Sequence, residues 1–284
     1  MTSTIPGHVG VVGGGRMGAG IAQVFATLGS TVTIAESGDR QAALARVSNG
    51  LDRAHERGKL GESDPATVLG RVSLVDAPEE LPAGLDLVVE AVPESVQLKL
   101  GVLAVVEKTV DPTTVIATNT SSISIADLGA VLDDPSRLIG MHFFNPVPAS
   151  TLVEIVRTPA TDADVVARVC EWVSQLGKSR VLVNDSPGFA TSRLGVCLGL
   201  EAIRMLEEGV ADAESIDRAM ELGYRHPMGP LRSTDLVGLD VRLAIAEHLT
   251  ETLGERFRPP ALLREKVARG ELGRKSGRGF FTWS

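Results

Sequence analysis

Short apolar runs and longer amphipathic stretches alternate from the start of the chain. The first apolar run, His8 to Val12, is followed by an amphipathic stretch that ends at Leu28 and then by a second run, Thr31 to Ala35. Apolar positions spaced three and four residues apart are typical of a helix that buries one face, whereas short apolar runs are typical of buried strands. The predicted order is therefore strand, helix, strand.

The next segment predicts two helices. Asp39 to Arg57 has a helical pattern, with Asp39 suited to cap its start and Gly58 suited to end it. A second, short helix is expected to begin near Ser63. Together these segments predict a helical hairpin inserted between strands.

Further β-branched runs follow, separated by segments with helical patterns. The predicted strands are Val72–Val75, Leu85–Val89, Val115–Ala117, Leu138–His142, Val153–Val156 and Arg180–Val183. Strands that alternate with helices build a parallel sheet covered by helices on both faces. The first part of the chain is therefore predicted to be an α/β domain.

After the last predicted strand the pattern is helical only. The predicted helices are Phe189–Leu206, Asp212–Glu221, Thr234–Leu253 and Pro260–Ala268. Ser186 and Pro187 suit the start of a helix, because proline is favoured in the first turn. At 284 residues the chain exceeds the usual size of one domain. We predict an α/β domain over residues 1–185 and an all-α domain over residues 186–284.

The turn after the first predicted strand has the spacing of a dinucleotide-binding loop. Gly13, Gly15 and Gly18 form the pattern G-x-G-x-x-G, with Arg16 and Met17 before the last glycine. The three glycines allow a tight turn, close approach of the backbone to a pyrophosphate, and close packing of the helix on the strand. Alone, this spacing is also compatible with a glycine-rich turn that binds nothing.

An acidic residue after the second predicted strand adds weight to the cofactor hypothesis. Glu36 follows the glycines by about 20 residues, as the dinucleotide fingerprint requires. A carboxylate there accepts hydrogen bonds from ribose hydroxyls and repels a 2′-phosphate, so NAD is favoured over NADP. Arg40, one helical turn further, is long enough to reach a phosphate in principle, but with Glu36 in place we do not expect it to bind one. The N-terminal domain is therefore predicted to be Rossmann-like and to bind NAD.

Composition excludes several classes of partner. The formal net charge is −8, so the surface as a whole repels nucleic acid and acidic membranes. Cys170 and Cys197 are the only cysteines, and both lie in apolar helical patterns. A disulfide framework needs more cysteines at loop positions. With no segment long enough to span a bilayer and no signal-like start, we expect a cytoplasmic protein; no metal-ligand spacing is evident.

A histidine lies where open α/β sheets present their ligand crevice, at the end of a predicted strand. This residue is His142, and Glu154 follows twelve positions later. Oxidation of an alcohol by hydride loss needs a base for the hydroxyl proton, and a histidine oriented by a carboxylate suits that role. A histidine between apolar residues is more often a core residue, and a glutamate is more often solvated. From the residues alone, both interpretations stay open.

Several segments, in the same order, carry a resemblance to a known family. They are the glycine loop, Val89–Glu94, Asn119–Ser122, Ile139–Pro148, Ser186–Phe189, His226–Pro230 and Gly273–Phe281. With these segments, the chain from His8 to Phe281 resembles the L-3-hydroxyacyl-CoA dehydrogenases of the short-chain, 3-hydroxybutyryl-CoA type. The family resemblance implies an NAD-dependent dehydrogenase that acts on an acyl-CoA substrate.

The resemblance also implies roles for individual residues. His142 is expected to be the base, Glu154 its orienting partner, and Ser121 a hydrogen-bond partner of the substrate oxygen that also touches the nicotinamide. The residues expected at NAD are Gly13, Gly15, Arg16, Met17, Gly18, Glu36, Ala91, Val92, Glu94, Lys99, Asn119, Ser121, Asn145 and Lys275. Without the family, the simplest interpretations of these polar residues are surface charges, caps and turn residues.

A CoA thioester brings phosphate charges that a chain of net charge −8 must meet locally. Arg53, Arg57 and Lys59 are the candidates, because they lie close to where the family binds CoA. Gly50 stands where the family has a serine. A charged helix end that is merely solvated is the alternative.

One further position departs from the family pattern. Ser192 lies where the family commonly has an asparagine, one residue before Arg193. Serine keeps a donor and an acceptor but loses reach and an amide group. We therefore expect Ser192 to contact the substrate oxygen directly, through water or not at all, which bears on efficiency and substrate choice more than on reaction class.

The leading hypothesis is oxidation of (3S)-3-hydroxybutyryl-CoA to the 3-oxoacyl-CoA, with NAD as cofactor, and the reverse reduction. One alternative keeps this chemistry on a carrier-protein-bound or dicarboxylic hydroxyacyl group. Another is an NAD-binding protein without activity, which only Ser192 favours. The apolar stretch Leu194 to Leu206 exceeds what a small helical domain needs, so a homodimer through the C-terminal domain is expected.

Overall fold

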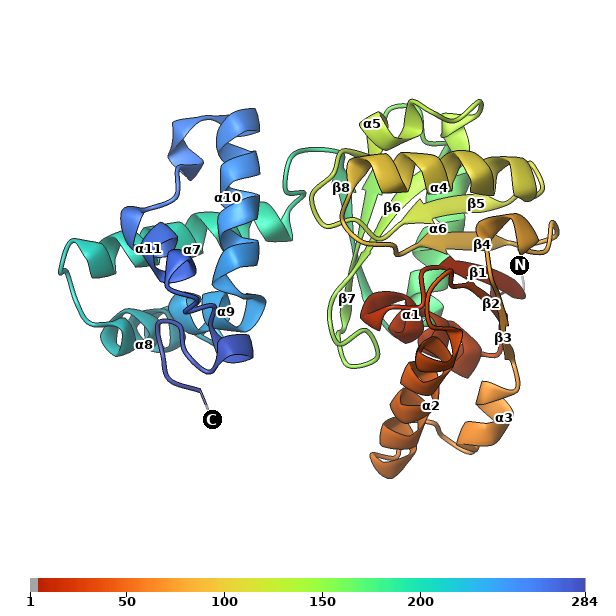
Figure 1. Ribbon diagram of the computed structural model, residues 1–284, viewed down its shortest axis with the longest axis horizontal. Coiled ribbons are helices and arrows are strands. Elements are labelled where there is room, and N and C mark those ends of the chain that lie inside the picture. Colours follow the sequence, from red (N-terminus) through yellow and green to blue (C-terminus); the bar gives the residue numbers. More distant parts are fainter. Residues whose placement is uncertain (1–4, 284) are drawn as a thin grey trace. The chain divides into compact units, whose positions relative to one another are not determined.

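The chain folds into two compact units, each with a hydrophobic core of its own. The computed structural model describes residues 5–283; the first unit ends at Asp185 and the second begins at Ser186. The first unit holds a sheet covered by helices, and the second is helical in its described part (Figure 1). The predicted class, a Rossmann-like α/β domain followed by an all-α domain, is confirmed.

An eight-stranded sheet forms the centre of the first unit. Its strands are β1 (His8–Val12), β2 (Thr31–Ala35), β3 (Val72–Val75), β4 (Leu87–Glu90), β5 (Val115–Thr118), β6 (Leu138–Phe143), β7 (Leu152–Arg157) and β8 (Ser179–Asn184). The spatial order is β3-β2-β1-β4-β5-β6-β7-β8, with β1 to β6 parallel, β7 antiparallel to β6, and β8 parallel to β7. The carboxyl ends of β1, β4, β5 and β6 therefore share one edge.

Helices cover both faces of this sheet. They are α1 (Arg16–Leu28), α2 (Arg40–Glu56), α3 (Pro65–Leu69), α4 (Val96–Thr109), α5 (Ile125–Gly129) and α6 (Ala163–Gln175). In Figure 1, α4 lies in front of β4 and β5, while α6 lies behind the sheet. Phe25 of α1 and Val169 of α6 belong to one buried cluster with alternate residues of the strands, so these two helices share a face.

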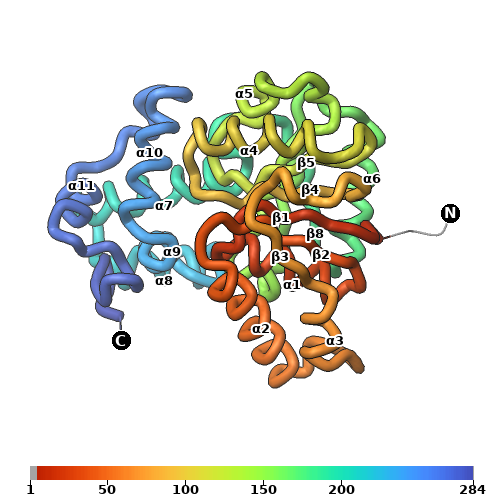
Figure 2. Tube along the Cα trace, turned by 45° about the vertical axis from the view of Figure 1, so that its right-hand side comes forward, coloured from red at the N-terminus to blue at the C-terminus, as the bar shows by residue number. Residues whose placement is uncertain are grey.

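The inserted helical hairpin is confirmed. Asp39 caps α2 by accepting a hydrogen bond from Ala42 N at 2.9 Å, and α2 ends before Gly58, which adopts φ +63°. The following α3 begins at Pro65. Figure 2 shows α2 and α3 side by side, projecting away from the sheet.

The second unit differs from the predicted helices at two joins. Its helices are α7 (Thr191–Glu207), α8 (Ala213–Gly223), α9 (Pro230–Val237), α10 (Leu239–Leu253) and α11 (Ala261–Ala268). The helix expected from Phe189 starts later, because Gly188 and Phe189 adopt φ +73° and +47°. The single helix expected from Thr234 is two helices, because Gly238 at φ +105° ends α9 and precedes α10. Positive φ is incompatible with a right-handed helix.

Asp235 of α9 anchors the C-terminal segment of the second unit. Its buried carboxylate accepts hydrogen bonds from Phe280 N at 2.8 Å, Phe281 N at 2.9 Å and Trp283 Nε1 at 2.8 Å. A Cβ at Gly273 would lie 2.2 Å from the Asp235 carbonyl oxygen. Packing against α9 therefore explains much of the sequence of the segment Gly273–Phe281.

Candidate active site

A histidine and a glutamate from neighbouring strands form a buried pair in the first unit. The register of β6 and β7 places His142 directly opposite Glu154, and side chains in that relation point to the same face of a sheet. His142 Nδ1 lies 2.8 Å from Glu154 Oε2. Glu154 is fully buried and His142 is 7% exposed. The carboxylate therefore orients the ring through Nδ1, which makes Nε2 the nitrogen suited to exchange a proton with a ligand.

The glycine loop between β1 and α1 has the geometry of a phosphate-binding turn. A Cβ at Gly18 would lie 1.8 Å from the Gly13 carbonyl oxygen, so only glycine allows α1 to pack this closely. Gly13 adopts φ +97°, and a Cβ there would lie 2.9 Å from the Ala91 carbonyl oxygen. Around Gly15, by contrast, no heavy atom beyond its chain neighbours lies within 4 Å of the Cβ position. The close approaches are structural, and the open space is beside the first turn of α1.

The first turn of α1 suits an anion. It contains Arg16 and Met17, holds no acidic residue, and has no side-chain cap at Gly15. The amide groups at a helix N-terminus carry partial positive charge, which favours a phosphate beside them.

Glu36 faces the same loop from the end of β2. Its Oε2 accepts a hydrogen bond from Gly14 N at 2.6 Å, and its Oε1 accepts one from Gly38 N at 2.7 Å. Arg46 of α2 donates to the Gly14 carbonyl oxygen at 3.1 Å. Arg40, considered above as a phosphate ligand, pairs instead with Asp76 at 2.6 Å. The acid is thus fixed at the rim of the glycine loop, as a ribose ligand requires.

Glu94 holds the loop that carries Ser121. Its Oε1 accepts hydrogen bonds from Thr120 Oγ1 at 2.5 Å and from Ser121 N at 3.0 Å. Burial raises the pKa of Glu94, but the charge of Lys99 and these hydrogen bonds outweigh burial, and the pKa lies below its ordinary value. An ionised Glu94 therefore fixes the backbone after β5.

Lys99 lies beneath this loop. Its side chain is 1% exposed, and its ammonium lies 2.8 Å from Glu90 Oε1 and 3.3 Å from Glu94 Oε2. Glu90, which also accepts a hydrogen bond from Val92 N at 2.7 Å, is fully buried. Sequence reasoning missed Glu90, because a glutamate that ends an apolar run carries no local signal of burial. Lys99 contacts Glu94, so its influence on a ligand passes through that residue.

The loops after β5 and β6 are tied together beside the histidine. Phe143 N donates to Asn119 Oδ1 at 2.9 Å, and Asn145 follows on the exposed part of the next loop. Lys178 supports that loop from below by donating to the Val147 carbonyl oxygen at 2.7 Å. Asn119 thus joins the ends of two neighbouring strands.

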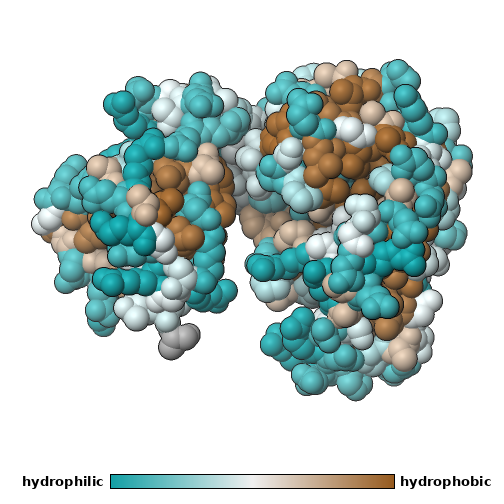
Figure 3. All heavy atoms as spheres, viewed as in Figure 1, coloured by the Kyte–Doolittle hydropathy of each residue, from teal (hydrophilic) through white to brown (hydrophobic). Residues whose placement is uncertain are grey.

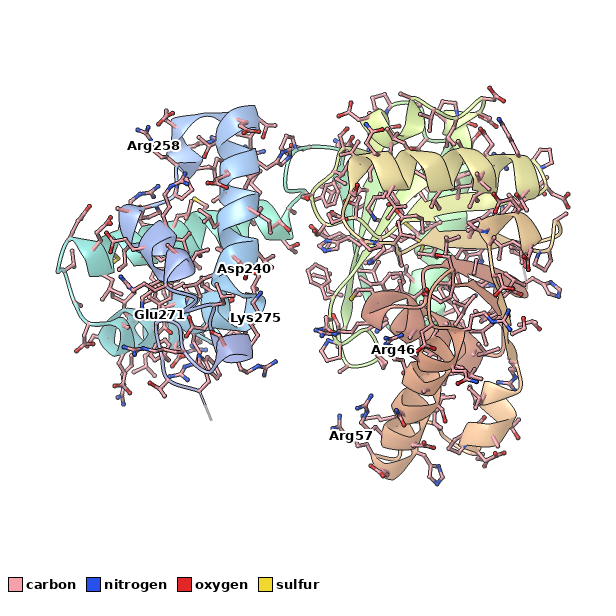
Figure 4. All side chains as sticks on the ribbon, in the orientation of Figure 1. Arg46, Arg57, Asp240, Arg258, Glu271 and Lys275 are labelled. Carbon is pink, nitrogen blue, oxygen red and sulfur yellow. The ribbon has the colours of Figure 1, made fainter. Side chains whose placement is uncertain are left out.

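Two predicted site residues belong to the second unit. Ser192 lies in the first turn of α7, and Lys275 lies in a short 3₁₀ turn, Arg274–Ser276. Lys275 Nζ lies 2.6 Å from Asp240 Oδ1 (Figure 4). Burial raises the pKa of Asp240, but the hydrogen bond from Lys275 outweighs it, and the pKa is lowered. The grouping of Ser192 and Lys275 with the residues of the first unit stays a prediction.

The basic residues predicted to meet CoA lie on α2 and just beyond it. Arg53, Arg57 and Lys59 are all exposed. Arg46, Arg53 and Arg57 recur at helical spacing, so they lie along one side of α2 and its C-terminal end, and Figure 4 shows Arg46 on α2 and Arg57 near that end. Arg46, which the sequence did not single out, extends the basic stripe to the glycine loop.

Within the described residues, no cluster of three histidine, cysteine or acidic side chains could hold a metal ion. In the same part of the chain, none of the helices combines the length and apolar character needed to cross a membrane.

Comparison with known families is decisive at this point. Residues 8–186 match the model of the 3-hydroxyacyl-CoA dehydrogenase NAD-binding domain, and residues 188–283 match the model of the C-terminal domain of the same enzymes. The chain belongs to the 3-hydroxyacyl-CoA dehydrogenase family. This is a family of NAD-dependent oxidoreductases, so the predicted enzyme class is confirmed.

Relatives in the 3-hydroxyacyl-CoA dehydrogenase family are similar over their whole length. A 3-hydroxybutyryl-CoA dehydrogenase of Mycobacterium tuberculosis is 44% identical over 281 residues, covering 97% of this chain and 98% of the relative. A probable 3-hydroxybutyryl-CoA dehydrogenase of Deinococcus radiodurans is 43% identical, covering 96% and 99%. The solved structure of (S)-3-hydroxybutyryl-CoA dehydrogenase from Ralstonia eutropha superposes with a TM-score of 0.93 at 42% identity, covering 98% and 99%.

Gly50 of α2 lies where the family resemblance leads us to expect a serine. A Cβ at Gly50 would lie 2.3 Å from Oε1 of the buried Gln23 of α1, so a side chain there requires Gln23 to move.

Proposed function

We propose that this chain is an NAD-dependent dehydrogenase that interconverts a (3S)-3-hydroxyacyl-CoA, with 3-hydroxybutyryl-CoA as substrate, and the 3-oxoacyl-CoA. The observation that carries the proposal is the buried His142–Glu154 pair at 2.8 Å. Loss of hydride from an alcohol carbon needs a base for the hydroxyl proton and a charge that stabilises the resulting imidazolium. The family supports the reaction, and the names of the relatives support the substrate.

The residues present fit NAD. The space at Gly15 and the uncapped first turn of α1 suit the pyrophosphate, and Glu36 suits the ribose hydroxyls while repelling a 2′-phosphate. Bound there, NAD supplies the hydride acceptor. The other residues that we assign to its binding are Gly13, Arg16, Met17, Gly18, Ala91, Val92, Glu94, Asn119, Ser121, Asn145 and Lys275, with Lys99 acting through Glu94.

Residues of the chain accept one proton during oxidation and return it during reduction. During oxidation, His142 Nε2 takes the hydroxyl proton as C3 loses its hydride, and Glu154 stabilises the imidazolium through Nδ1. Ser121 positions the substrate oxygen, and its backbone is held by Glu94. Ser192 is assigned as a second hydroxyl partner of the same oxygen. During reduction, His142 returns the proton to the carbonyl oxygen.

We assign the CoA moiety to the basic face of α2. Arg53, Arg57 and Lys59 supply positive charge on a chain of net charge −8, and Arg46 continues this charge toward the glycine loop. Arginine suits the binding of phosphate because its planar fork can donate two hydrogen bonds at once. Binding of CoA esters is therefore expected to weaken as ionic strength rises.

Oxidation of NADH in the presence of acetoacetyl-CoA tests the reaction. We expect turnover by the wild type and a fall of about 10³-fold or more in kcat for His142→Ala, because the general base is lost. His8→Ala, which removes an exposed histidine at the start of β1, is the matched control and should keep full activity. Absence of turnover in the wild type, or full turnover in His142→Ala, would refute the proposal.

The carrier and acyl group need a separate measurement. We expect kcat/KM for acetoacetyl-CoA to exceed that for the same acyl group on an acyl carrier protein and for dicarboxylic 3-oxoacyl-CoA esters. A preference for either rival would replace 3-hydroxybutyryl-CoA as the assigned substrate without changing the chemistry. NAD binding without hydride transfer to any of them would favour the non-catalytic alternative.

We also assign a homodimer to the second unit, where α7 exposes Leu194 and Cys197.

Neither Cys170 nor Cys197 forms a disulfide. Two unpaired thiols suit a reducing compartment, and we therefore assign the enzyme to the cytoplasm.

A further inference from the structure

A buried ion pair lies under the loop that carries Ser121. Glu90, the last residue of β4, has no exposed surface, and Lys99 of α4 is 1% exposed. Lys99 Nζ donates to both carboxylate oxygens, at 2.8 and 2.9 Å. Thr118 Oγ1 adds a hydrogen bond to Glu90 Oε2 at 2.6 Å, and Val92 N adds one to Oε1 at 2.7 Å. Four hydrogen bonds from three donor groups thus satisfy one buried carboxylate.

Two of the three charged side chains of α4 are buried, which is unusual for a surface helix. Lys99 and Glu107 of α4 are buried, whereas Val96 and Leu98 are 45% and 43% exposed. Figure 3 shows an apolar surface over this part of the first unit. Burial of a charge is costly unless it is paired, so each inward charge must be held by a specific partner.

Lys99 connects Glu90 to Glu94. Its ammonium lies 3.3 Å from Glu94 Oε2, while Glu94 Oε1 accepts the hydrogen bonds from Thr120 Oγ1 and Ser121 N. Each oxygen of Glu94 therefore has a different task. One oxygen meets the buried ammonium, and the other holds the backbone that presents Ser121.

We infer that Glu90 and Lys99 are positioning residues of the proposed dehydrogenase: together they hold the Glu94 carboxylate in place, and Glu94 holds the loop of residues 119–122. Glu90 fixes the position of Lys99, Lys99 fixes the position of Glu94, and Glu94 fixes the position of Ser121. The consequence for turnover rests on the proposed function. The consequence for the loop does not, because every contact in this chain of interactions joins two residues of the protein itself.

The same helix offers a matched control. Glu107 is also a buried carboxylate of α4, and its oxygens accept hydrogen bonds from Asp133 N at 2.8 Å and Asp134 N at 2.9 Å. Arg137 lies 3.6 Å away as its ion-pair partner. This second pair holds a different loop, after α5. Glu107→Gln therefore removes a buried charge from α4 without touching Glu90, Lys99 or Glu94.

Amide hydrogen exchange of the ligand-free, full-length protein reads the loop directly. In Lys99→Met and in Glu90→Gln, we expect exchange in residues 118–124 to accelerate about tenfold or more, because Ser121 N loses a well-placed acceptor. Glu107→Gln should leave that segment unchanged and accelerate residues 131–135 instead. Unchanged exchange in residues 118–124 in both site variants, or equal acceleration in Glu107→Gln, overturns the inference.

The pH profile gives a second readout that a merely structural role would not move. Burial raises the pKa of Glu94, and the charge of Lys99 is the largest influence that lowers it, so removal of Lys99 raises the pKa of that carboxyl relative to the wild type. A larger fraction of Glu94 is then protonated at mildly acidic pH, so the acidic limb of kcat/KM in Lys99→Met should move upward by about one pH unit. The acidic limb of Glu107→Gln should coincide with that of the wild type. A coincident limb in Lys99→Met contradicts the assigned role of Lys99.

Two provisions keep the outcomes separate. If the wild type shows no dehydrogenase activity, the proposed function fails, and hydrogen exchange alone decides the inference. If Lys99→Met and Glu90→Gln do not fold, Thr118→Val takes their place, because it removes the hydrogen bond to Glu90 without removing a charge. The same hydroxyl accepts a hydrogen bond from Thr120 N at 3.3 Å, so Thr120 is left out of the readout. We expect a threefold or larger acceleration, on the order of one lost hydrogen bond, in residues 121–124. Unchanged exchange in this folded variant overturns the inference.

Discussion

Glu36 commits both of its carboxylate oxygens to backbone amides of the two loops that flank it, Gly14 N at 2.6 Å and Gly38 N at 2.7 Å. Each oxygen keeps one further lone pair for a ligand hydroxyl. The negative charge is what discriminates against a 2′-phosphate, whereas the geometry is set by the two amides. A substitution that removes the charge of Glu36 but keeps the size of its side chain therefore tests the effect of the charge on cofactor preference.

Glu36→Gln tests the choice of cofactor. Glutamine keeps the size of the side chain, but its NH₂ group cannot accept the hydrogen bond that one amide donates, and the charge is lost. We expect kcat/KM for NADH to fall about 10- to 100-fold, while the ratio of NADH to NADPH efficiency falls at least tenfold. Glu62→Gln, at an exposed position before α3, is the control. An unchanged cofactor ratio would remove Glu36 as the source of preference.

Glu154→Gln tests the partner of the histidine. The amide keeps the volume of the buried side chain but cannot stabilise an imidazolium by charge. We expect kcat to fall about 10²- to 10⁴-fold with little change in KM for NADH. Because Glu154 acts through His142, the double variant with His142→Ala should be no slower than His142→Ala alone. Additive losses in the double variant would show a separate role for Glu154.

The sequence predicts the places of Glu36 and His142 for a physical reason, since both lie at the ends of predicted strands, where open α/β sheets bind ligands. The role of Glu154 as the partner of His142 comes from the resemblance to the 3-hydroxyacyl-CoA dehydrogenases. Glu90 and Lys99 are different, because their pairing depends on how α4 is rotated against β4. A lysine on an apolar helix is expected to be solvated, and only tertiary packing shows that it points inward.

At the scale of elements, the glycine loop separates residues needed for packing from residues needed for binding. Gly18 brings α1 against the turn, and the first turn of that helix then faces the open space at Gly15. The loop therefore packs α1 closely against β1, and it is also the phosphate site that we propose.

Gly18→Ala and Gly15→Ala form a matched pair. A Cβ at Gly18 meets the Gly13 carbonyl oxygen at 1.8 Å, so α1 must shift, and we expect a loss of about 1–3 kcal/mol in the free energy of unfolding together with loss of NAD binding. Alanine at Gly15 meets no heavy atom within 4 Å beyond its chain neighbours. We expect stability there to stay within about 0.5 kcal/mol, while NAD affinity falls. Urea unfolding and NADH fluorescence titration measure both quantities.

Equal destabilisation by the two alanines would contradict this division of roles. So would unchanged NAD affinity in Gly15→Ala, since the open space would then not be the phosphate site.

Elements were predictable where local pattern and packing agree. The strands His8–Val12, Thr31–Ala35 and Val72–Val75 have the predicted bounds, since apolar runs flanked by turns are buried in any register. The predicted start of α7 at Phe189 and the predicted single helix over Thr234–Leu253 were wrong. The positive φ of Phe189 and Gly238 is imposed by the surrounding chain and leaves no mark in the periodicity.

At the scale of the whole molecule, the described part of the second unit exposes several apolar side chains and buries one unpaired charge. We assign the dimer interface to an apolar patch defined by Leu194, Val237 and Val241, which are 70%, 45% and 42% exposed. Arg242 follows Val241, is 6% exposed, and lies against Gly195 of α7. Burial lowers the pKa of Arg242 to about 10, and its Nε has no hydrogen-bond partner among the described residues. Exposed apolar residues close in sequence to a buried, unpaired charge favour an interface with a second copy of the chain.

Leu194→Glu tests the homodimer that we assign to this patch. An acidic side chain forced into an apolar interface costs about 2 kcal/mol or more, on the order of 30-fold in the dissociation constant of the dimer. We expect light scattering after size exclusion to show a dimer for the wild type and a monomer for Leu194→Glu at micromolar concentration. Leu222→Glu is the matched control, since Leu222 is 71% exposed on α8, outside the patch. A monomeric wild type, or dissociation by Leu222→Glu alone, would place the interface elsewhere or remove it.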